Sequence, residues 1–290
     1  MSSYILTVTC PSNERIMPVI SRYLVKKDCN ILCLSQFDDL DTRFFFLRVN
    51  FTFKNNTSIE NFLDDFQPII QQFSMKFSIR NAKKAVKTLI LVSRLYHCLH
   101  DLLYRWNMGT LNLNIIGVVS NHLLHKQMVE NYHIPFHYIP VTQKTRIQSE
   151  KKLIEIIDKH NVGLIVLARY MQIISDQLCS KMAGRIINVH HSFLPSFKGA
   201  HPYKQAYEYG VKIIGATAHY VTSELDAGPI IAQDVKHITH AQNVEDYSKI
   251  GKKIEAKVLT SAVTAHIQHR VFINKRKTIV FPDHPNNYSE

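Results

Sequence analysis

Strand-like and helix-like segments alternate through the second two-thirds of the chain, and this alternation constrains the fold more than any other feature. Short apolar strand patterns occur at residues 88–93, 113–120, 136–139, 162–168 and 186–189. Amphipathic helical patterns separate them at 96–106, 122–132, 146–160 and 175–182. Such alternation predicts an α/β fold with a doubly wound, mostly parallel, Rossmann-like sheet. Ligands of these sheets bind beyond the carboxyl ends of the strands, near the point where the strand order reverses.

The sheet pattern continues toward the C-terminus. We expect further strands at 211–220 and 230–235, a long helix at 244–269, and a two-strand ribbon at 270–281. The tail that follows carries no regular pattern.

Residues 4–80 follow a different order of elements. Strand patterns at 4–10, 30–37, 43–53 and 74–80 are interrupted by helical patterns after 11–14 and at 58–73. The resulting βαββαβ order is the ferredoxin-like pattern. A polar, basic connector at 81–87 separates this unit from the alternating region, so we predict domains at 1–82 and 83–290.

Composition narrows the class of protein. The 290 residues are 46% hydrophobic, enough for two globular domains, and no apolar run reaches the roughly 18 residues of a membrane span. The N-terminal residues lack the basic and apolar regions of a signal peptide. Five cysteines, an odd number without framework spacing, favour reduced thiols and a cytoplasmic protein.

The formal net charge of +12 raises the question of a nucleic-acid partner. Lysines and arginines are scattered in short clusters, and no basic stripe is interleaved with aromatic residues. We therefore expect solvated basic faces and no nucleic-acid or membrane partner. The 16 histidines include pairs at i, i+3, but none has a third ligand at suitable spacing, so no metal site is predicted.

Three polar residues near the end of the parallel region form a candidate catalytic group. Asn188 and His190 are two positions apart in a β-branched run, so they lie on one face of a strand end. Asp226 follows 36 positions after His190, in an Asp-Ala-Gly-Pro turn. Taken singly, each is more often a turn former or a satisfied polar residue. Together they supply an oxyanion donor, a proton carrier and an orienting carboxylate, which suits the opening of a carbonyl group.

The segments 186–203 and 225–230 resemble the catalytic core of the formyl-folate hydrolases and transferases, and within them the deformylase family. The resemblance covers nearly the whole chain and is strongest from Lys87 to Phe281. It implies that Asn188, His190 and Asp226 are catalytic, and that the reaction is hydrolysis of 10-formyltetrahydrofolate to formate and tetrahydrofolate. Such an enzyme balances the one-carbon folate pool and supplies formate for purine synthesis. No cofactor or metal is implied, because the folate derivative is the substrate.

The same resemblance implies a set of substrate-binding residues. They end the strand pattern at 162–168, follow the catalytic histidine, or precede the catalytic aspartate: Leu167, Arg169, Tyr170, Met171, His191, Ser192, Gly199 and Leu225. The excess of basic charge would attract an anionic substrate such as a polyglutamylated folate.

Formyl transfer to a nucleotide or to a tRNA is the alternative within the resemblance. Nucleotide-dependent relatives carry a glycine-rich turn after the first strand of this domain, but residues 91–101 contain no glycine and place Leu95 and Tyr96 there. tRNA-dependent relatives carry a C-terminal barrel, for which few residues remain after Val271. A non-catalytic folate- or amino-acid-binding regulator is a third alternative.

The first 80 residues resemble an ACT domain, which implies a homo-oligomer. Arg15 stands where that resemblance leads us to expect glycine. A side chain there would crowd a small effector, so the sequence argues against an amino-acid ligand.

Overall fold

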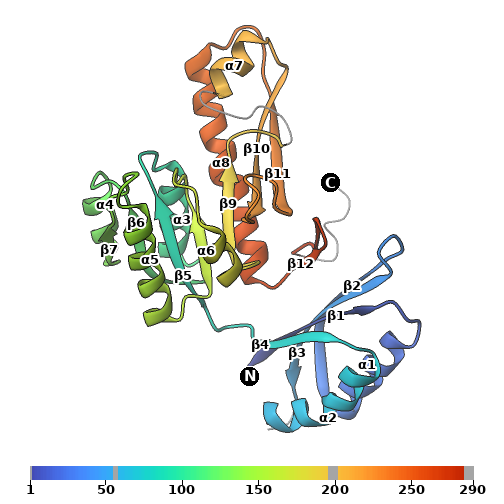
Figure 1. Cartoon of the computed structure of the whole chain (residues 1–290). Helices are drawn as coiled ribbons and strands as arrows, with labels where there is room; N and C mark the ends of the chain where they lie inside the picture. The colour runs from blue at the N-terminus through green and yellow to red at the C-terminus, as the bar shows by residue number, and fades with distance from the viewer. Residues whose placement is uncertain (1, 55–57, 195–201, 284–290) are drawn as a thin grey trace. The chain divides into compact units, whose positions relative to one another are not determined.

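The computed structural model describes residues 2–54, 58–194 and 202–283, and the chain folds as two units (Figure 1). The first contains residues up to Ala85 together with 268–274 and the described residues from Ile279 on. The second contains Val86–Ile267 and Lys275–Thr278. The sequence predicts one domain for all residues after 82, whereas the structure groups most of the C-terminal ribbon with the first unit.

The first unit is an antiparallel sheet in the order β2-β3-β1-β4, with two helices. Its elements are β1 (Ser3–Pro11), α1 (Ile16–Lys26), β2 (Cys29–Asp39), β3 (Phe44–Phe53), α2 (Ile59–Gln72) and β4 (Lys76–Asn81). Alternate residues of β1, among them Leu6 and Val8, are fully buried against Phe62 and Phe66 of α2. The predicted ferredoxin-like order is confirmed.

The C-terminal ribbon consists of β12 (Val271–Asn274) and β13 (Lys277–Val280). Phe272 and Phe281 pack against Phe46 of β3 in a small buried cluster. Arg48 Nε donates to the carbonyl of Gln268 at 3.1 Å. These contacts between residues distant in sequence explain why the ribbon groups with the first unit. A local sequence pattern cannot predict them.

The second unit is built on a seven-stranded sheet in the order β11-β10-β9-β8-β5-β6-β7. Its strands are β5 (Val86–Val92), β6 (Leu113–Ser120), β7 (Phe136–Tyr138), β8 (Leu164–Leu167), β9 (Ile186–His190), β10 (Ile213–Tyr220) and β11 (Ile230–His237). Strands β5 to β9 are parallel, and β10 and β11 run antiparallel to them. The strand order reverses between β5 and β8, so the predicted doubly wound sheet is confirmed and its carboxyl edge is where a ligand site is expected.

Helices cover both faces of this sheet. They are α3 (His97–Asn107), α4 (Lys126–Glu130), α5 (Arg146–His160), α6 (Asp176–Lys181), α7 (Pro202–Glu208) and α8 (Val244–Ile267). Leu153 of α5 and Leu178 of α6 pack with Leu89 and Ile165 on one face, while α8 contacts α3, β9 and β10.

Two helices differ from prediction. Helix α4 is shorter than the expected 122–132, because turns precede it: the backbone N–H of His122 bonds the Ser120 hydroxyl, and that of Lys126 bonds the carbonyl of Leu123. Helix α7 was not predicted.

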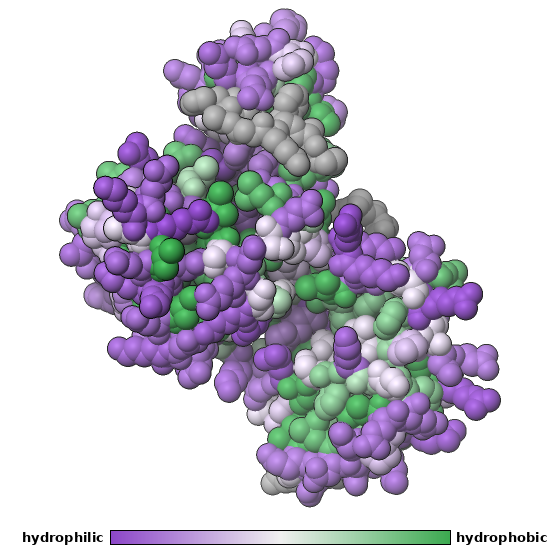
Figure 2. All heavy atoms as spheres, viewed as in Figure 1, coloured by the Kyte–Doolittle hydropathy of each residue, from purple (hydrophilic) through white to green (hydrophobic). Residues whose placement is uncertain are grey.

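Polar residues cover most of the visible face of each unit in Figure 2, and apolar residues lie between them in smaller patches. Within the described parts of the chain, no helix is long and apolar enough to cross a membrane.

Candidate active site

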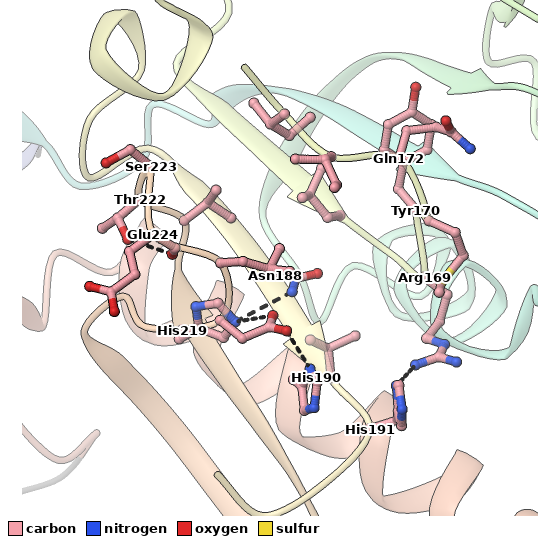
Figure 3. Close-up of a pocket in the computed structure, with 18 residues that line it drawn as sticks. Arg169, Tyr170, Gln172, Asn188, His190, His191, His219, Thr222, Ser223 and Glu224 are labelled. Atoms are coloured by element: carbon pink, nitrogen blue, oxygen red, sulfur yellow. Dashed lines mark hydrogen bonds and ion pairs between the residues drawn. The ribbon is translucent and has the colours of Figure 1, made fainter. Parts of the chain in front are cut away.

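Strand β9 ends at the carboxyl edge of the sheet and presents Asn188 and His190 there (Figure 3). Its antiparallel neighbour β10 pairs His219 with Asn188 and Thr217 with His190. Since paired residues project to the same side of a sheet, His219 joins the predicted residues.

Asp226 reaches this group from the turn that joins β10 to β11. Its Oδ2 lies 3.2 Å from Nδ1 of His190, and its Oδ1 lies 3.6 Å from Nε2 of His219. The hydrogen bond from His190, followed by that from His219, holds the pKa of Asp226 well below its ordinary value. Asp226 is therefore a carboxylate at neutral pH, placed to stabilise a proton on His190.

Gly228 explains how the turn brings Asp226 so close. A Cβ at this position would overlap the carbonyl oxygen of Tyr220. The backbone N–H of Tyr220 also donates to the carbonyl of Pro229 at 2.9 Å, which closes the turn. Only glycine permits this approach of the two backbone segments.

His190 has one satisfied ring nitrogen and one unsatisfied one. Nδ1 faces Asp226, while the buried Nε2 has no hydrogen-bond partner among the described residues. Buried polar atoms in folded proteins nearly always have partners, so an exception at a pocket is a candidate for exchange with a ligand.

His219 is a site residue that sequence reasoning missed. Its Nδ1 lies 3.0 Å from the carbonyl oxygen of Tyr220, and because a carbonyl can only accept, this nitrogen carries a proton. Nε2 lies 3.3 Å from Nδ2 of Asn188 and 3.6 Å from Oδ1 of Asp226, so the ring stands between the amide and the carboxylate. The only signal in the sequence was a histidine inside a buried strand pattern. The pairing of β10 with β9, which brings His219 to Asn188, cannot be read from the sequence.

These residues line a cavity of about 300 Å³. Six of the eight expected substrate-binding residues also line it, namely Leu167, Arg169, Tyr170, Met171, His191 and Leu225. Ser192 is buried and does not line the cavity, and its backbone carbonyl accepts from the Thr217 hydroxyl at 3.0 Å. Gly199 lies outside the described residues. Lining residues that no prediction named are Gln172, Ile173, Ile174, Val189 and Val221.

The loop after β8 is anchored to the end of β5. The backbone N–H of Ser93 donates to the carbonyl of Arg169 at 3.2 Å, and the Ser93 hydroxyl accepts from the backbone N–H of Met171 at 3.0 Å. Arg169 has a φ of 65°, and Nη1 of its guanidinium lies 2.7 Å from Nδ1 of His191. Neighbouring strands at the switch point thus jointly form one wall of the cavity.

Three metal-ligand side chains meet in the second unit, namely His97, Cys98 and Glu255. Nε2 of His97 is 2.7 Å from Oε2 of Glu255, and the Tyr203 hydroxyl donates to Oε1. Burial, then Glu255, raises the pKa of the Cys98 thiol well above its ordinary value. With the carboxylate oxygens already accepting and the thiol protonated, these side chains fit a hydrogen-bonded cluster better than a metal site.

Comparison with known proteins shows which family the second unit resembles. Residues 86–263 match the family described as formyl transferase. Among solved structures, a glycinamide ribonucleotide transformylase from Symbiobacterium toebii is 25% identical, with a TM-score of 0.63, and covers 68% of this chain and 95% of its own.

Relatives of a narrower kind match the full length. A formyltetrahydrofolate deformylase from Corynebacterium sp. (strain P-1) is 44% identical over 96% of this chain and 97% of its own. The deformylase of Bacillus subtilis (strain 168) is 42% identical over 95% and 93%. The crystal structure of a Burkholderia mallei deformylase is 40% identical, covers 97% of this chain and 100% of its own, and has a TM-score of 0.93. The chain belongs to the formyltetrahydrofolate deformylase family.

Proposed function

We propose that this chain hydrolyses 10-formyltetrahydrofolate with water as the acceptor, releasing formate and tetrahydrofolate. The deformylase names of relatives that match both units support this proposal. The observation that carries it is the cavity-lining His190, which holds Asp226 on one nitrogen and leaves the other without a partner.

Asn188 would stabilise the charge that develops on the formyl oxygen. One Nδ2 hydrogen faces His219, so the second can donate to a ligand in the cavity. Such a donor acts most strongly when oxygen gains negative charge, and losing one typically costs about 10²–10³ in rate.

His190 would carry the proton. Its Nε2 takes a proton from the water that attacks the formyl carbon, forming the carbon–oxygen bond of a tetrahedral intermediate. The same proton passes to N10 as the carbon–nitrogen bond breaks, and the formic acid formed loses its remaining acidic proton to water, so the products are formate and tetrahydrofolate. Asp226 stabilises the imidazolium between the two steps. These steps use only side chains of this chain and water.

The cavity would hold the folate through the residues around Arg169–Met171 and Leu225. Its lining mixes apolar side chains with a few polar groups, as is usual for an organic ligand. The net charge of +12 would favour approach of an anionic folate.

Two further proposals concern the whole protein. The ferredoxin-like order of the first unit supports an ACT-type module and a homo-oligomer, which light scattering of the purified protein would test. The five cysteines are free thiols, which supports a reducing compartment such as the cytoplasm.

Formyl transfer to a nucleotide is less well supported. A phosphate would be expected at the start of α3, where the turn 93–96 has no glycine and the first helical residue, His97, holds the buried carboxylate Glu255. The negative charge of Glu255 at this helix start would repel a bound phosphate. The solved transformylase matches only 68% of this chain, whereas the solved deformylase matches 97%.

The decisive experiment measures formate release from 10-formyltetrahydrofolate with no acceptor other than water. We expect catalytic release by the wild-type protein and a loss of about 10²–10⁴ in the His190→Ala variant. Turnover that begins only when glycinamide ribonucleotide or initiator methionyl-tRNA is added would show a transferase instead.

A further inference from the structure

A buried carboxylate, Glu255, lies behind Arg169, which contacts the histidine next to His190. Glu255 of α8 has a side chain that is only 1% exposed. It accepts from His97 of α3 and Tyr203 of α7, and its Oε2 lies 3.4 Å from Nε of Arg169. Three separate elements therefore converge on one carboxylate, which none of the steps proposed above uses.

Helix α8 is shaped to admit this cluster. Gly251 lies one turn before Glu255, and a Cβ there would overlap the ring of Tyr203. Glycine is unfavourable in a helix interior, by about 1 kcal/mol relative to alanine. Here it makes room for the tyrosine that holds Glu255.

Arg169 connects Glu255 with the histidines at the cavity. Its Nη1 lies 2.7 Å from Nδ1 of His191. A guanidinium can only donate, so Nδ1 of His191 must accept, and a ring that accepts at Nδ1 is neutral with its proton on Nε2. The His191 ring stacks on His190, with centroids 4.7 Å apart and planes 18° apart.

We propose that Glu255 is a positioning residue that balances the charge of Arg169 and so lets His190 take up a proton beside a neutral His191. This inference rests on the proposed function, because it concerns the proton that His190 carries. Glu255 touches neither the cavity nor His190, and it acts through Arg169 and His191.

The groups around His190 make the direction of the effect clear. His219 faces it from β10, Asp226 from the turn after β10, Asn188 from β9, His191 from the position after β9, and Arg169 from the loop after β8. The groups behind Arg169 are Glu255 and, around it, His97, Cys98 and Tyr203. Removing the charge of Glu255 leaves Arg169 as an unbalanced buried cation, which opposes protonation of His190.

Glu255 is charged in this setting. Burial raises its pKa, but the His97 hydrogen bond, the charge of Arg169 and the Tyr203 hydrogen bond outweigh burial, so the net pKa lies below the ordinary value.

The test is the pH dependence of kcat/KM for formate release by the Glu255→Gln variant. Glutamine keeps the size and one acceptor oxygen, and its amide nitrogen can donate to the Tyr203 oxygen or to the other tautomer of His97, so the loss of charge is the main change. The acid limb, which reports deprotonation of His190, should move to lower pH by about 0.5–1 unit. An acid limb that stays at the wild-type pH would overturn the proposal, even if activity falls, since a purely structural role lowers rate without moving the limb.

Glu245→Gln is the matched control, because it is the same substitution in an exposed position on the same helix. Solvent and salt screen that position, so its acid limb should coincide with the wild-type limb. An equal shift in both variants would mean a general charge effect and would count against the proposal.

Imidazole ¹⁵N NMR of the substrate-free wild-type protein tests the same idea without turnover or a stable variant. His191 should keep its proton on Nε2 and stay neutral from about pH 5.5 to 8, although free histidine titrates in that range. A proton on Nδ1, or titration of His191 there, would overturn the proposal. If the wild-type protein releases no formate, the proposed function fails, and this measurement still decides the inference.

Discussion

Two carboxylate–histidine pairs in the described part of the second unit, Asp226 with His190 and Glu255 with His97, use the same chemistry for different purposes. Asp226 and His190 are 3.2 Å apart at the cavity, and Glu255 and His97 are 2.7 Å apart under α8. Both carboxylates have a lowered pKa. The side chain of Asp226 is 18% exposed, whereas that of Glu255 is 1% exposed.

The difference lies in what each pair leaves unsatisfied. Glu255 has donors on both oxygens, and its partners come from α3, α7 and the loop after β8. Beside Asp226, Nε2 of His190 is buried and without a partner in the described chain. A pair with every group satisfied holds structure, while a pair with one group aimed at a cavity can exchange a proton with a ligand. Residue types alone do not separate the two.

The largest effect should come from the cavity pair. Asp226→Asn should lower the rate of formate release by about 10²–10⁴, because the imidazolium loses its counter-charge. The fold should persist, since asparagine tolerates the φ of 54° found at this position. Steady-state kinetics with circular dichroism would check both points. Glu224→Gln, an exposed carboxylate lining the same cavity, is the control, and an equal loss there would contradict the role of Asp226.

Asn188→Ala should have the next largest effect, a loss of about 10²–10³ in kcat, or roughly 2.7–4 kcal/mol. The alanine removes the proposed donor to the formyl oxygen but leaves Asp226 and His190 paired. Folate binding, measured by calorimetry, should change far less than kcat. A variant that loses binding and keeps kcat would show that Asn188 holds the substrate and does not stabilise the transition state.

Gly251→Ala tests the packing around the Glu255–His97 pair, because Gly251 makes room for Tyr203. The new methyl would overlap the Tyr203 ring, and overpacking of this kind costs about 1–3 kcal/mol of unfolding free energy. Denaturant unfolding would measure the change. Ser261→Ala, at an exposed position of the same helix, should stay within about 0.5 kcal/mol of wild type. Stabilisation by Gly251→Ala would mean that Tyr203 moves away at no cost.

The smallest effect concerns stability at acid pH, and both pairs contribute to it. A carboxylate whose pKa is lowered by folding adds stability above its unfolded-state pKa and loses it as pH falls. The ordinary values are 3.8 for Asp226 and 4.5 for Glu255. Unfolding free energy should therefore decline below about pH 5, and less steeply in Asp226→Asn and in Glu255→Gln. Slopes equal to wild type in both variants would show that neither pair contributes.

Much of the fold was predictable because it rests on local periodicity. The strand at 113–120 and the helix at 146–160 were predicted with the bounds they have, since buried strands and amphipathic helices repeat every two and every 3.6 residues. Helix α4 is shorter than predicted because two turns precede it. The Ser120 hydroxyl closes one of them, and the backbone carbonyl of Leu123 closes the other. The ribbon at 271–280 was predicted, but its packing on Phe46 was not.

The candidate site divides in the same way. Asn188, His190 and Asp226 were found because a strand end and a turn present them at short range, and the structure brings them together. His219 was missed because its role depends on the register of β10 against β9. Glu255, 65 residues beyond His190, gains its partners only when α3, α7 and α8 pack together.

The amino-acid sequence by itself determined the two fold classes, the order of elements and the three polar residues at the end of β9 and in the turn after β10. Each of these depends on neighbours within a few positions, where backbone geometry is set by local sterics and hydrogen bonds. The tertiary structure alone decided that Nε2 of His190 has no partner among the described residues, which histidine stacks on His190 and which carboxylate balances Arg169. Those outcomes depend on the packing of residues distant in sequence, and burial away from water is what gives the resulting charges and hydrogen bonds their strength.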